Sequence, residues 1–338
     1  MFTHRFFLWA PLCLQNPPAL PRRYDFPGAR HPKQPMLEFH DVRLVLDARA
    51  ALAECPLWCA DEQKLYWVDI TGRAINRFDP ATSENRRWPM PWEPGCIALA
   101  AGGGLVAAMR DGFYRFFPAD SSLTKIADAP YDITQMRFND GRCDAFGRLW
   151  VGAMFEARTA ESASVYCLER GKVRLGWGPH DNRGVKVSNG MAFALDNQHV
   201  FQSDTPNHVI YKIAFDLKTG AAGERRTFAR RPDNRADVVY GGRPDGAAID
   251  CAGNYWSAQY EGSCVLCYSL QGDITGIVHV PSKRVTSVAF GGIEMRTLYI
   301  TTAREGALKA ELATDIHAGG IFACEVNVPG RAEPLYLD

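Results

Sequence analysis

The chain has 338 residues and no net charge, with 38 Lys and Arg residues against 38 Asp and Glu residues. Its hydrophobic fraction of 46% and charged fraction of 22% are typical of a folded globular protein. A neutral chain lacks the large basic field of a general nucleic-acid-binding protein, and no run of 18 apolar residues predicts a transmembrane helix. We therefore expect neither a nucleic acid nor a membrane as partner.

Residues 1–36 are rich in Pro and Arg and show neither helical nor strand periodicity. Arg5 and the apolar run after it resemble a signal peptide only in part, because Pro11 interrupts the run and no small-residue cleavage site follows. We expect a disordered N-terminal extension over residues 1–36, with Met36 as an alternative start of translation.

Ten cysteines are scattered through the chain, a pattern that does not predict a small disulfide scaffold. Cys264 and Cys267 form a C-x-x-C motif within a strand-like run. Positions i and i+3 of a strand face opposite sides of the sheet, so this motif predicts neither a zinc site nor a redox pair. Buried free thiols fit a reducing compartment, and we expect the protein in the cytoplasm.

From Met36 onward, short strand-like runs alternate with turn residues, and no long helical period is present. Similar runs begin near Leu65, Leu105, Leu149, Val200, Tyr255 and Leu298, at intervals of 40, 44, 51, 55 and 43 residues. These intervals are typical of four-stranded propeller blades. The predicted fold class is therefore all-β, with a single six-bladed β-propeller over residues 37–338.

A turn signature accompanies these units, in which an Asp precedes the turn and an aromatic residue follows it. It recurs at Asp61, Asp144, Asp196 and Asp250. Because Asp in such turns accepts hydrogen bonds from nearby backbone N–H groups, we assign these four residues a structural role.

Glu54 stands in the apolar run "LAECPLW", where a carboxylate needs a partner. Asn139, Asn189 and Asp245 occupy nearly the same place in three other units, since all four residues precede the Asp of their own turn by five or seven positions. Equivalent positions in propeller blades form a ring around the central axis. We therefore expect these side chains to converge at one mouth of the channel, although Asn-Gly and Asp-Gly are also ordinary turn sequences.

Two carboxylates and one or two amide oxygens suit a hard divalent cation. Ca²⁺, Mg²⁺ and Mn²⁺ fit such ligands, and Fe²⁺ and Zn²⁺ stay open as alternatives. A single cation at this mouth would also supply the partner that Glu54 requires.

An ordered set of motifs carries a family resemblance. The stretches "AECPLW…LYWVDI", "RFNDGRCDAFGRLWVGAM", "VSNGMAFALD", "PDGAAIDCAGNYW", "VTSVAFGG…LYITTA" and "AGGIFA" together resemble the SMP-30/gluconolactonase/regucalcin-like family over about residues 40–325. The resemblance implies a six-bladed propeller with one divalent metal near the channel mouth, and enzymes that hydrolyse sugar lactones.

The resemblance also implies residue roles. Carried over position by position, Glu54, Asn189 and Asp245 are the metal ligands. On chemical grounds we also assign Asp245 the role of catalytic general base for water, because a carboxylate beside the substrate can reach the proton it removes. Arg137 and Asn139 are substrate ligands; they lie two positions apart on an extended segment and so face the same side.

Some family members have a further acidic substrate contact just after a "GTMAE" stretch. Here the stretch reads "GAMFEAR", in which Ala157 stands at the equivalent position and Glu156 is offset by one place. Glu156 is therefore the candidate for this substrate contact.

Two other classes of function stay open, because propellers host many activities. One is a non-enzymatic propeller that binds metal for regulation or serves as a scaffold. The other is a metal-dependent hydrolase of organophosphates or of other esters and lactones. The substrate is expected to be a small sugar lactone selected by the loops over residues 155–165, 176–187 and 228–243, and a monomer is expected.

Overall fold

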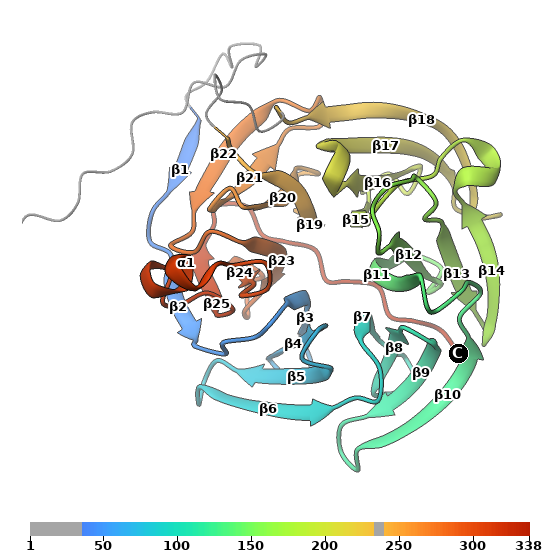
Figure 1. Ribbon diagram of the computed structural model, residues 1–338, viewed down its shortest axis with the longest axis horizontal. Helices are drawn as coiled ribbons and strands as arrows, with labels where there is room; N and C mark the ends of the chain where they lie inside the picture. Colours follow the sequence, from blue (N-terminus) through green and yellow to red (C-terminus); the bar gives the residue numbers. More distant parts are fainter. Residues whose placement is uncertain (1–35, 233–239) are drawn as a thin grey trace, which may run out of the picture.

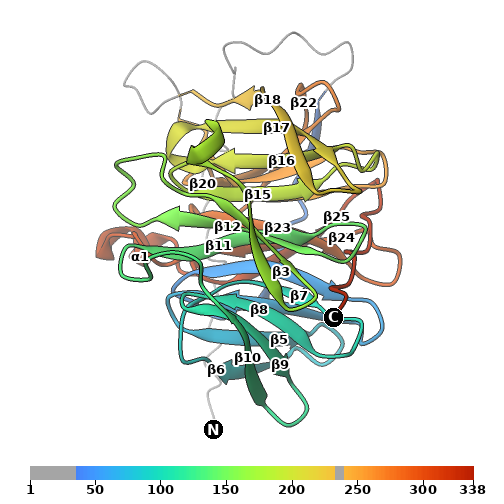
Figure 2. The same cartoon turned by 90° about the vertical axis from the view of Figure 1, so that its right-hand side faces the viewer.

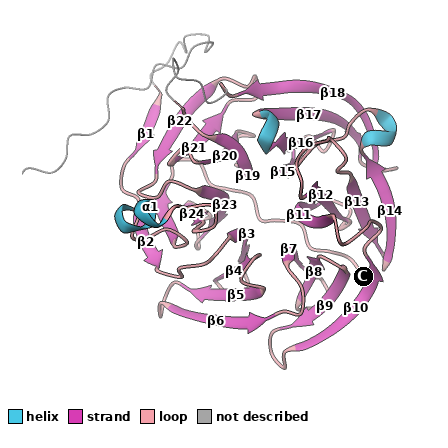
Figure 3. Cartoon of the chain, in the orientation of Figure 1, coloured by secondary structure: helices cyan, strands magenta, loops and turns pink. Residues whose placement is uncertain are grey.

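The computed structural model describes residues 36–232 and 240–338, so the predicted N-terminal extension lies outside the described residues except for Met36. Six antiparallel blades surround a central axis and confirm the predicted all-β six-bladed propeller (Figure 1). The few helical segments lie in connections between strands (Figure 3). The strand runs predicted from the sequence are the second strand of each blade, and the first strands line the axis.

The first three blades follow one another in chain order. Blade one holds β3 (Ala53–Cys59), β4 (Lys64–Asp69), β5 (Ala74–Asp79) and β6 (Glu84–Pro89). Blade two holds β7 (Pro94–Leu99), β8 (Leu105–Met109), β9 (Gly112–Phe117) and β10 (Ser122–Asp128). Blade three holds β11 (Met136–Cys143), β12 (Leu149–Phe155), β13 (Val165–Glu169) and β14 (Lys172–Trp177).

The last three blades complete the ring. Blade four holds β15 (Ser188–Phe193), β16 (His199–Asp204), β17 (Val209–Asp216) and β18 (Ala221–Arg230). Blade five holds β19 (Arg243–Ile249), β20 (Tyr255–Tyr260), β21 (Cys264–Tyr268) and β22 (Ile274–His279), and blade six holds β23 (Val285–Gly291), β24 (Thr297–Thr302) and β25 (Ile321–Glu325). Short helices η1 (Pro179–Asp181), η2 (Thr205–Asn207) and α1 (Lys309–Thr314) lie between strands.

Two N-terminal strands close the ring. β2 (Arg43–Leu46) pairs antiparallel with β25 and supplies the outer strand of blade six. β1 (Leu37–Phe39) adds a parallel strand to β22 at the edge of blade five. The segment that precedes the first blade thus joins the last two blades and covers edges that would otherwise be open to another chain.

Two of the turn aspartates, Asp144 and Asp250, stabilise their turns by hydrogen bonds, as predicted. Asp144 accepts hydrogen bonds from the backbone N–H groups of Phe146 and Arg148 and, at 2.8 Å, from the indole N–H of Trp150. Asp250 binds the backbone of its own turn and the indole of Trp256 at 2.9 Å in the same way. Each Asp therefore holds the turn and also orients a buried tryptophan.

Aromatic rings pack where neighbouring blades meet. Trp58 of blade one stacks on Tyr299 of blade six with ring centroids 5.5 Å apart, and Trp256 of blade five meets Phe290 of blade six at 5.9 Å. Cys264 and Cys267 are both buried, and they contribute to two different apolar clusters. None of the cysteines in the described ranges forms a disulfide, and no helix there has the length and apolar character to span a membrane.

A register shift occurs at the same level of four inner strands. The pairing slips after Glu54 in β3, after Phe138 in β11, after Asn189 in β15 and after Pro244 in β19. Such bulges re-aim side chains and are common beside active sites. Glu54 and Asn189 are the last regular residues before their bulges, whereas Asn139 and Asp245 are the first bulged residues.

The C-terminal segment crosses the channel (Figure 1) at the mouth where the inner strands end. Gly330 bridges to Asp250 and Tyr336 bridges to Ala100, both at turns between the first and second strands of blades. Tyr336 is buried, and Leu337 donates its N–H to the carbonyl of Gly147 at 2.9 Å. Figure 2 shows the C-terminus and α1 on opposite faces of the disc.

Candidate active site and metal centre

One cavity opens at the mouth where the inner strands begin, and it contains about 560 Å³ of empty space, counting the part open to solvent. Five of the six site residues predicted from the sequence line it: Glu54, Arg137, Asn139, Asn189 and Asp245. The structure thus brings together side chains from blades one, three, four and five. Their proposed roles as ligands stay predictions.

Glu54 and Asp245 are two buried carboxylates, 6% and 5% exposed. Burial, and then repulsion by Asp140, raises the pKa of Glu54 to about 8. Burial, followed by repulsion from Glu54 and Asp140, raises the pKa of Asp245 well above its ordinary value. Burial is the largest cause of both shifts, and nearby arginines offset it only in part.

Hydrogen bonds link the polar side chains around the ring. Asn139 Nδ2 donates to Asn189 Oδ1 at 2.7 Å and to the carbonyl of Ser188 at 2.9 Å. Asn189 Nδ2 in turn donates to Asp245 Oδ1 and, at 3.0 Å, to Thr205 Oγ1. The chain of contacts fixes the two amides and Asp245 relative to one another.

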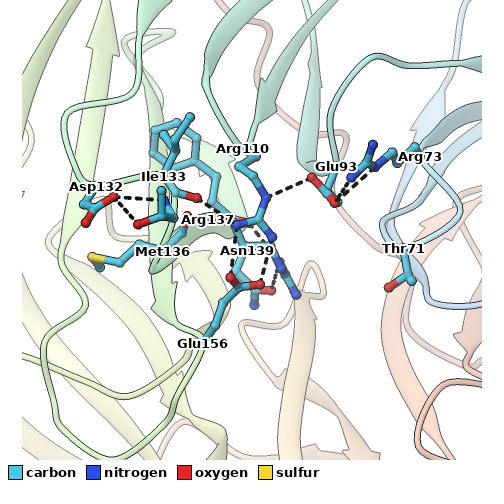
Figure 4. A network of polar contacts seen from close by, with 12 residues as sticks. Thr71, Arg73, Glu93, Arg110, Asp132, Ile133, Met136, Arg137, Asn139 and Glu156 are labelled. Atoms are coloured by element: carbon cyan, nitrogen blue, oxygen red, sulfur yellow. Dashed lines mark hydrogen bonds and ion pairs between the residues drawn. The ribbon is translucent and has the colours of Figure 1, made fainter.

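Arg137 lies beside Asn139 on the same strand (Figure 4). Its Nη1 donates to Asn139 Oδ1 at 2.8 Å and to the carbonyl of Phe138 at 2.9 Å. Among residues 36–232 and 240–338, hydrogen bonds engage only this one nitrogen of Arg137, so further N–H groups of this cavity-lining side chain are available to a ligand.

Glu156 is the predicted site residue that does not line the cavity. Its two oxygens accept hydrogen bonds from Arg110, at 2.8 and 3.0 Å, and this contact lowers the pKa of Glu156 (Figure 4). Arg110 also contacts Glu93 at 2.9 Å. The carboxylate of Glu156 therefore joins blades two and three through a charged network at the side of the site.

The donor set fits a hard divalent cation. No three His, Cys, Asp or Glu side chains gather into a metal site in residues 36–232 and 240–338, so a cation here depends on two carboxylates and amide oxygens. Neither Glu54 nor Asp245 has an ion pair within the same ranges, and bound positive charge would relieve their repulsion. Asn189 presents its nitrogen to Asp245, so its amide must turn over before Oδ1 serves as a ligand.

The sequence did not single out several residues of the cavity wall, notably Arg158, Arg243, Tyr260 and Glu305. The first two nevertheless lie in loops 155–165 and 228–243, which were expected to select the substrate. A signal for one of them was present. Arg243-Pro-Asp245 repeats the Arg-x-Asx spacing of Arg137-Phe-Asn139 at the corresponding place in another blade. The other three lie in second strands and connections, where no repeat marks them.

Residues 52–304 match the sequence model of the SMP-30/gluconolactonase/LRE-like region. The chain belongs to this family. A 6-deoxy-6-sulfogluconolactonase of Pseudomonas putida is 40% identical over 301 residues, covering 87% of this chain and 98% of that protein. A pentonolactonase of Haloferax volcanii is 35% identical over 301 residues, covering 86% and 97% of the two chains.

A solved structure of the same family has the same fold. It is regucalcin from Agrobacterium tumefaciens, described as a calcium-binding protein; it superposes with a TM-score of 0.81 at 25% identity and covers 89% of this chain and 99% of its own. Family members therefore include proteins named as lactonases and one described as binding calcium.

Proposed function

We propose that this family member is a metal-dependent sugar lactonase, which hydrolyses an aldono-1,4- or aldono-1,5-lactone to the aldonic acid. The observation that carries the proposal is the pair of buried carboxylates, Glu54 and Asp245, which have no ion pair among the described residues. Arg137 and Asn139 line the same cavity. The lactonase names of the Pseudomonas putida and Haloferax volcanii relatives support it.

Glu54, Asn189 and Asp245 would hold one divalent cation. Its identity among Ca²⁺, Mg²⁺, Mn²⁺, Zn²⁺ and Fe²⁺ is open, and the calcium-binding relative supports the class rather than the element. When bound, such an ion polarises a carbonyl and eases ionisation of water.

The chain's own residues supply the acid–base and orienting steps. Asp245 accepts the proton of the water that attacks the lactone carbonyl carbon. A general base must lie within reach of that water, and Asp245 lines the cavity. The bond from the carbonyl carbon to the ring oxygen breaks, and the ring oxygen leaves as a hydroxyl after taking the proton that Asp245 received from water. Arg137 and Asn139 hold the polyol hydroxyls and orient the ring.

Glu156 has no substrate contact in this proposal, because its carboxylate is engaged by Arg110. We further propose a monomer in the cytoplasm, with a small sugar lactone as its only partner. Free buried cysteines support a reducing compartment.

The test is hydrolysis of sugar 1,4- and 1,5-lactones, followed by pH-stat and corrected for spontaneous opening. Chelator-stripped protein is assayed first, and each candidate divalent cation is then added back. We expect no turnover without metal and restored turnover with at least one cation. Metal binding without turnover of any lactone would contradict the proposal and favour a regulatory metal-binding propeller.

A further inference from the structure

The cavity wall carries more positive charge than the proposed reaction uses. Its lining includes three arginines, Arg137, Arg158 and Arg243, and three acids, Glu54, Asp245 and Glu305. A divalent cation offsets the charge of Glu54 and Asp245. Glu305 is then the one remaining acid of the lining beside three guanidinium groups. Glu261, outside the lining, offsets part of the charge of Arg243, and the wall still suits a ligand that is itself negatively charged.

Arg158 is the least compensated of these arginines. It follows β12 in a turn, where its N–H binds the carbonyl of Phe155 at 2.9 Å and its φ is 55°, in the left-handed region. Its side chain is exposed at the rim of the cavity. In the part of the chain that the structure describes, its guanidinium has neither a hydrogen bond nor an ion pair, so all of its donors face solvent or a ligand.

Arg243 is held more firmly in the wall. Its Nη2 donates to Glu261 at 2.8 Å, and its guanidinium lies over the ring of Tyr260 at 5.1 Å. Its Nε is buried without a hydrogen-bond partner among the described residues. Glu261 offsets part of the charge of Arg243. Arg243 therefore holds an N–H donor in a fixed place in the wall, and Arg158 adds N–H donors that have no partner among the described residues.

Arg158 and Arg243 come from blades three and five, and both border the same cavity as Asp245. Glu305, the remaining acid of the wall, accepts a hydrogen bond from Thr71 and is among the charges that act on Arg137. Arg158 and Arg243 are therefore the two arginines of the lining that the proposed reaction does not use.

We propose that Arg158 and Arg243 form an anion subsite, and that the substrate is a sugar lactone with a phosphate or sulfonate group remote from its carbonyl. Guanidinium groups suit such oxyanions because they donate several hydrogen bonds in a fixed plane. This proposal rests on the proposed lactonase function, and it adds the class of substrate to it. Arg158 is the specificity-determining residue.

The test compares kcat/KM of the metal-loaded protein for four 1,5-lactones: neutral gluconolactone and its 6-phospho, 6-sulfo and 6-carboxylate analogues. We expect the phospho or sulfo compound to exceed gluconolactone by about tenfold or more, and added salt to reduce that ratio. The two compounds distinguish the phosphate from the sulfonate source. The carboxylate compound shows whether any anion suffices.

Arg158→Gln is expected to lower kcat/KM for the preferred anionic lactone by roughly 10- to 100-fold, mainly through KM, and to change the neutral lactone less than about threefold. Arg158→Lys should recover part of the loss because it retains the charge. Arg170→Gln is the matched control: Arg170 is also exposed and also has a left-handed φ, of 48°, but it does not line the cavity.

A second readout separates this proposal from the lactonase function. Calorimetry measures binding of 6-phosphogluconate and gluconate to wild type and to Arg158→Gln. We expect tighter binding of the phosphorylated acid and loss of that difference in the variant. Equal binding of both acids, or an equal loss of kcat/KM for charged and neutral lactones, would overturn the anion subsite, whereas no lactone turnover with the binding difference intact would overturn only the lactonase proposal.

Discussion

The two mouths of the central channel differ in how buried charge is balanced. At the mouth with the cavity, Glu54 and Asp245 are buried and neither has an ion pair within the described ranges. At the mouth crossed by the C-terminal segment, Arg142 is equally buried, but it pairs with Glu333 at 3.4 Å and donates to the carbonyl of Ala247 at 2.8 Å.

This difference indicates at which mouth a ligand binds. Burying a charge without a partner is costly, and at the C-terminal mouth the fold supplies the partner itself. Both mouths are built from the same inner strands, so the architecture alone does not leave charge uncompensated. We infer that a bound cation balances the two carboxylates at the cavity mouth and that the substrate binds beside it.

The largest expected effect comes from removing the charge of Asp245. Asp245→Asn should lower kcat for the preferred lactone by roughly 10³-fold or more, because the variant loses both a metal ligand and a base. The measurement is pH-stat kinetics at saturating metal, with Asp128→Asn, an exposed site outside the cavity, as control. A loss below tenfold in a folded variant would contradict the role of Asp245.

The next largest effect is expected from removing the buried arginine at the mouth that the C-terminal segment crosses. Arg142→Met should reduce the free energy of unfolding by about 3 kcal/mol, because Asp140 and Glu333 lose a buried partner. Glu333→Gln should cost about 1 kcal/mol or less, since its side chain is 26% exposed and Arg142 retains the carbonyl of Ala247. Urea unfolding measures both values. Equal small losses would show that this charge pair does not stabilise the closed mouth.

A smaller effect is expected from neutralising Glu156, which lies beside the cavity and not in its lining. Glu156→Gln should change kcat and KM by less than about twofold and stability by less than about 1 kcal/mol, because its ion pair with Arg110 is 39% exposed on the Glu156 side. Steady-state kinetics with the preferred lactone is the measurement. A tenfold rise in KM would return Glu156 to the substrate site that the sequence suggested.

The smallest effect concerns residues 1–35. A chain that begins at Met36 keeps every strand that the structure describes, because the first of these, β1, starts at Leu37. We expect unchanged activity and an unchanged Tm, measured by pH-stat and thermal unfolding. Loss of soluble protein or of activity would show that the N-terminal residues contribute to the fold or the site.

The blade repeat made the fold predictable, because turn and strand signals recur locally about every 40 to 55 residues. The same repeat located Glu54 and Asp245, since equivalent positions in a closed ring must converge. The level of the bulges and the covering of one mouth by the C-terminal segment were not predicted. Both depend on contacts between distant parts of the chain, such as the bridge between Ala100 and Tyr336.

The partners of individual charged side chains were the least predictable feature. Glu156 and Arg110 are 46 residues apart and lie in different blades, so no local pattern indicates their ion pair. Arg158 stands two residues after Glu156 but remains at the cavity rim. Which of two neighbouring charges meets a protein partner and which meets a ligand depends on three-dimensional packing rather than on sequence spacing.

The most direct test of the central claim is calorimetric titration of divalent cations into chelator-stripped protein. Wild type is predicted to bind one cation per chain, and Glu54→Gln to bind it at least about tenfold more weakly. Glu305→Gln, which alters another carboxylate of the same cavity, should bind the cation like wild type. Absence of cation binding, or equal binding by wild type and Glu54→Gln, would contradict the view that the uncompensated mouth is a metal centre.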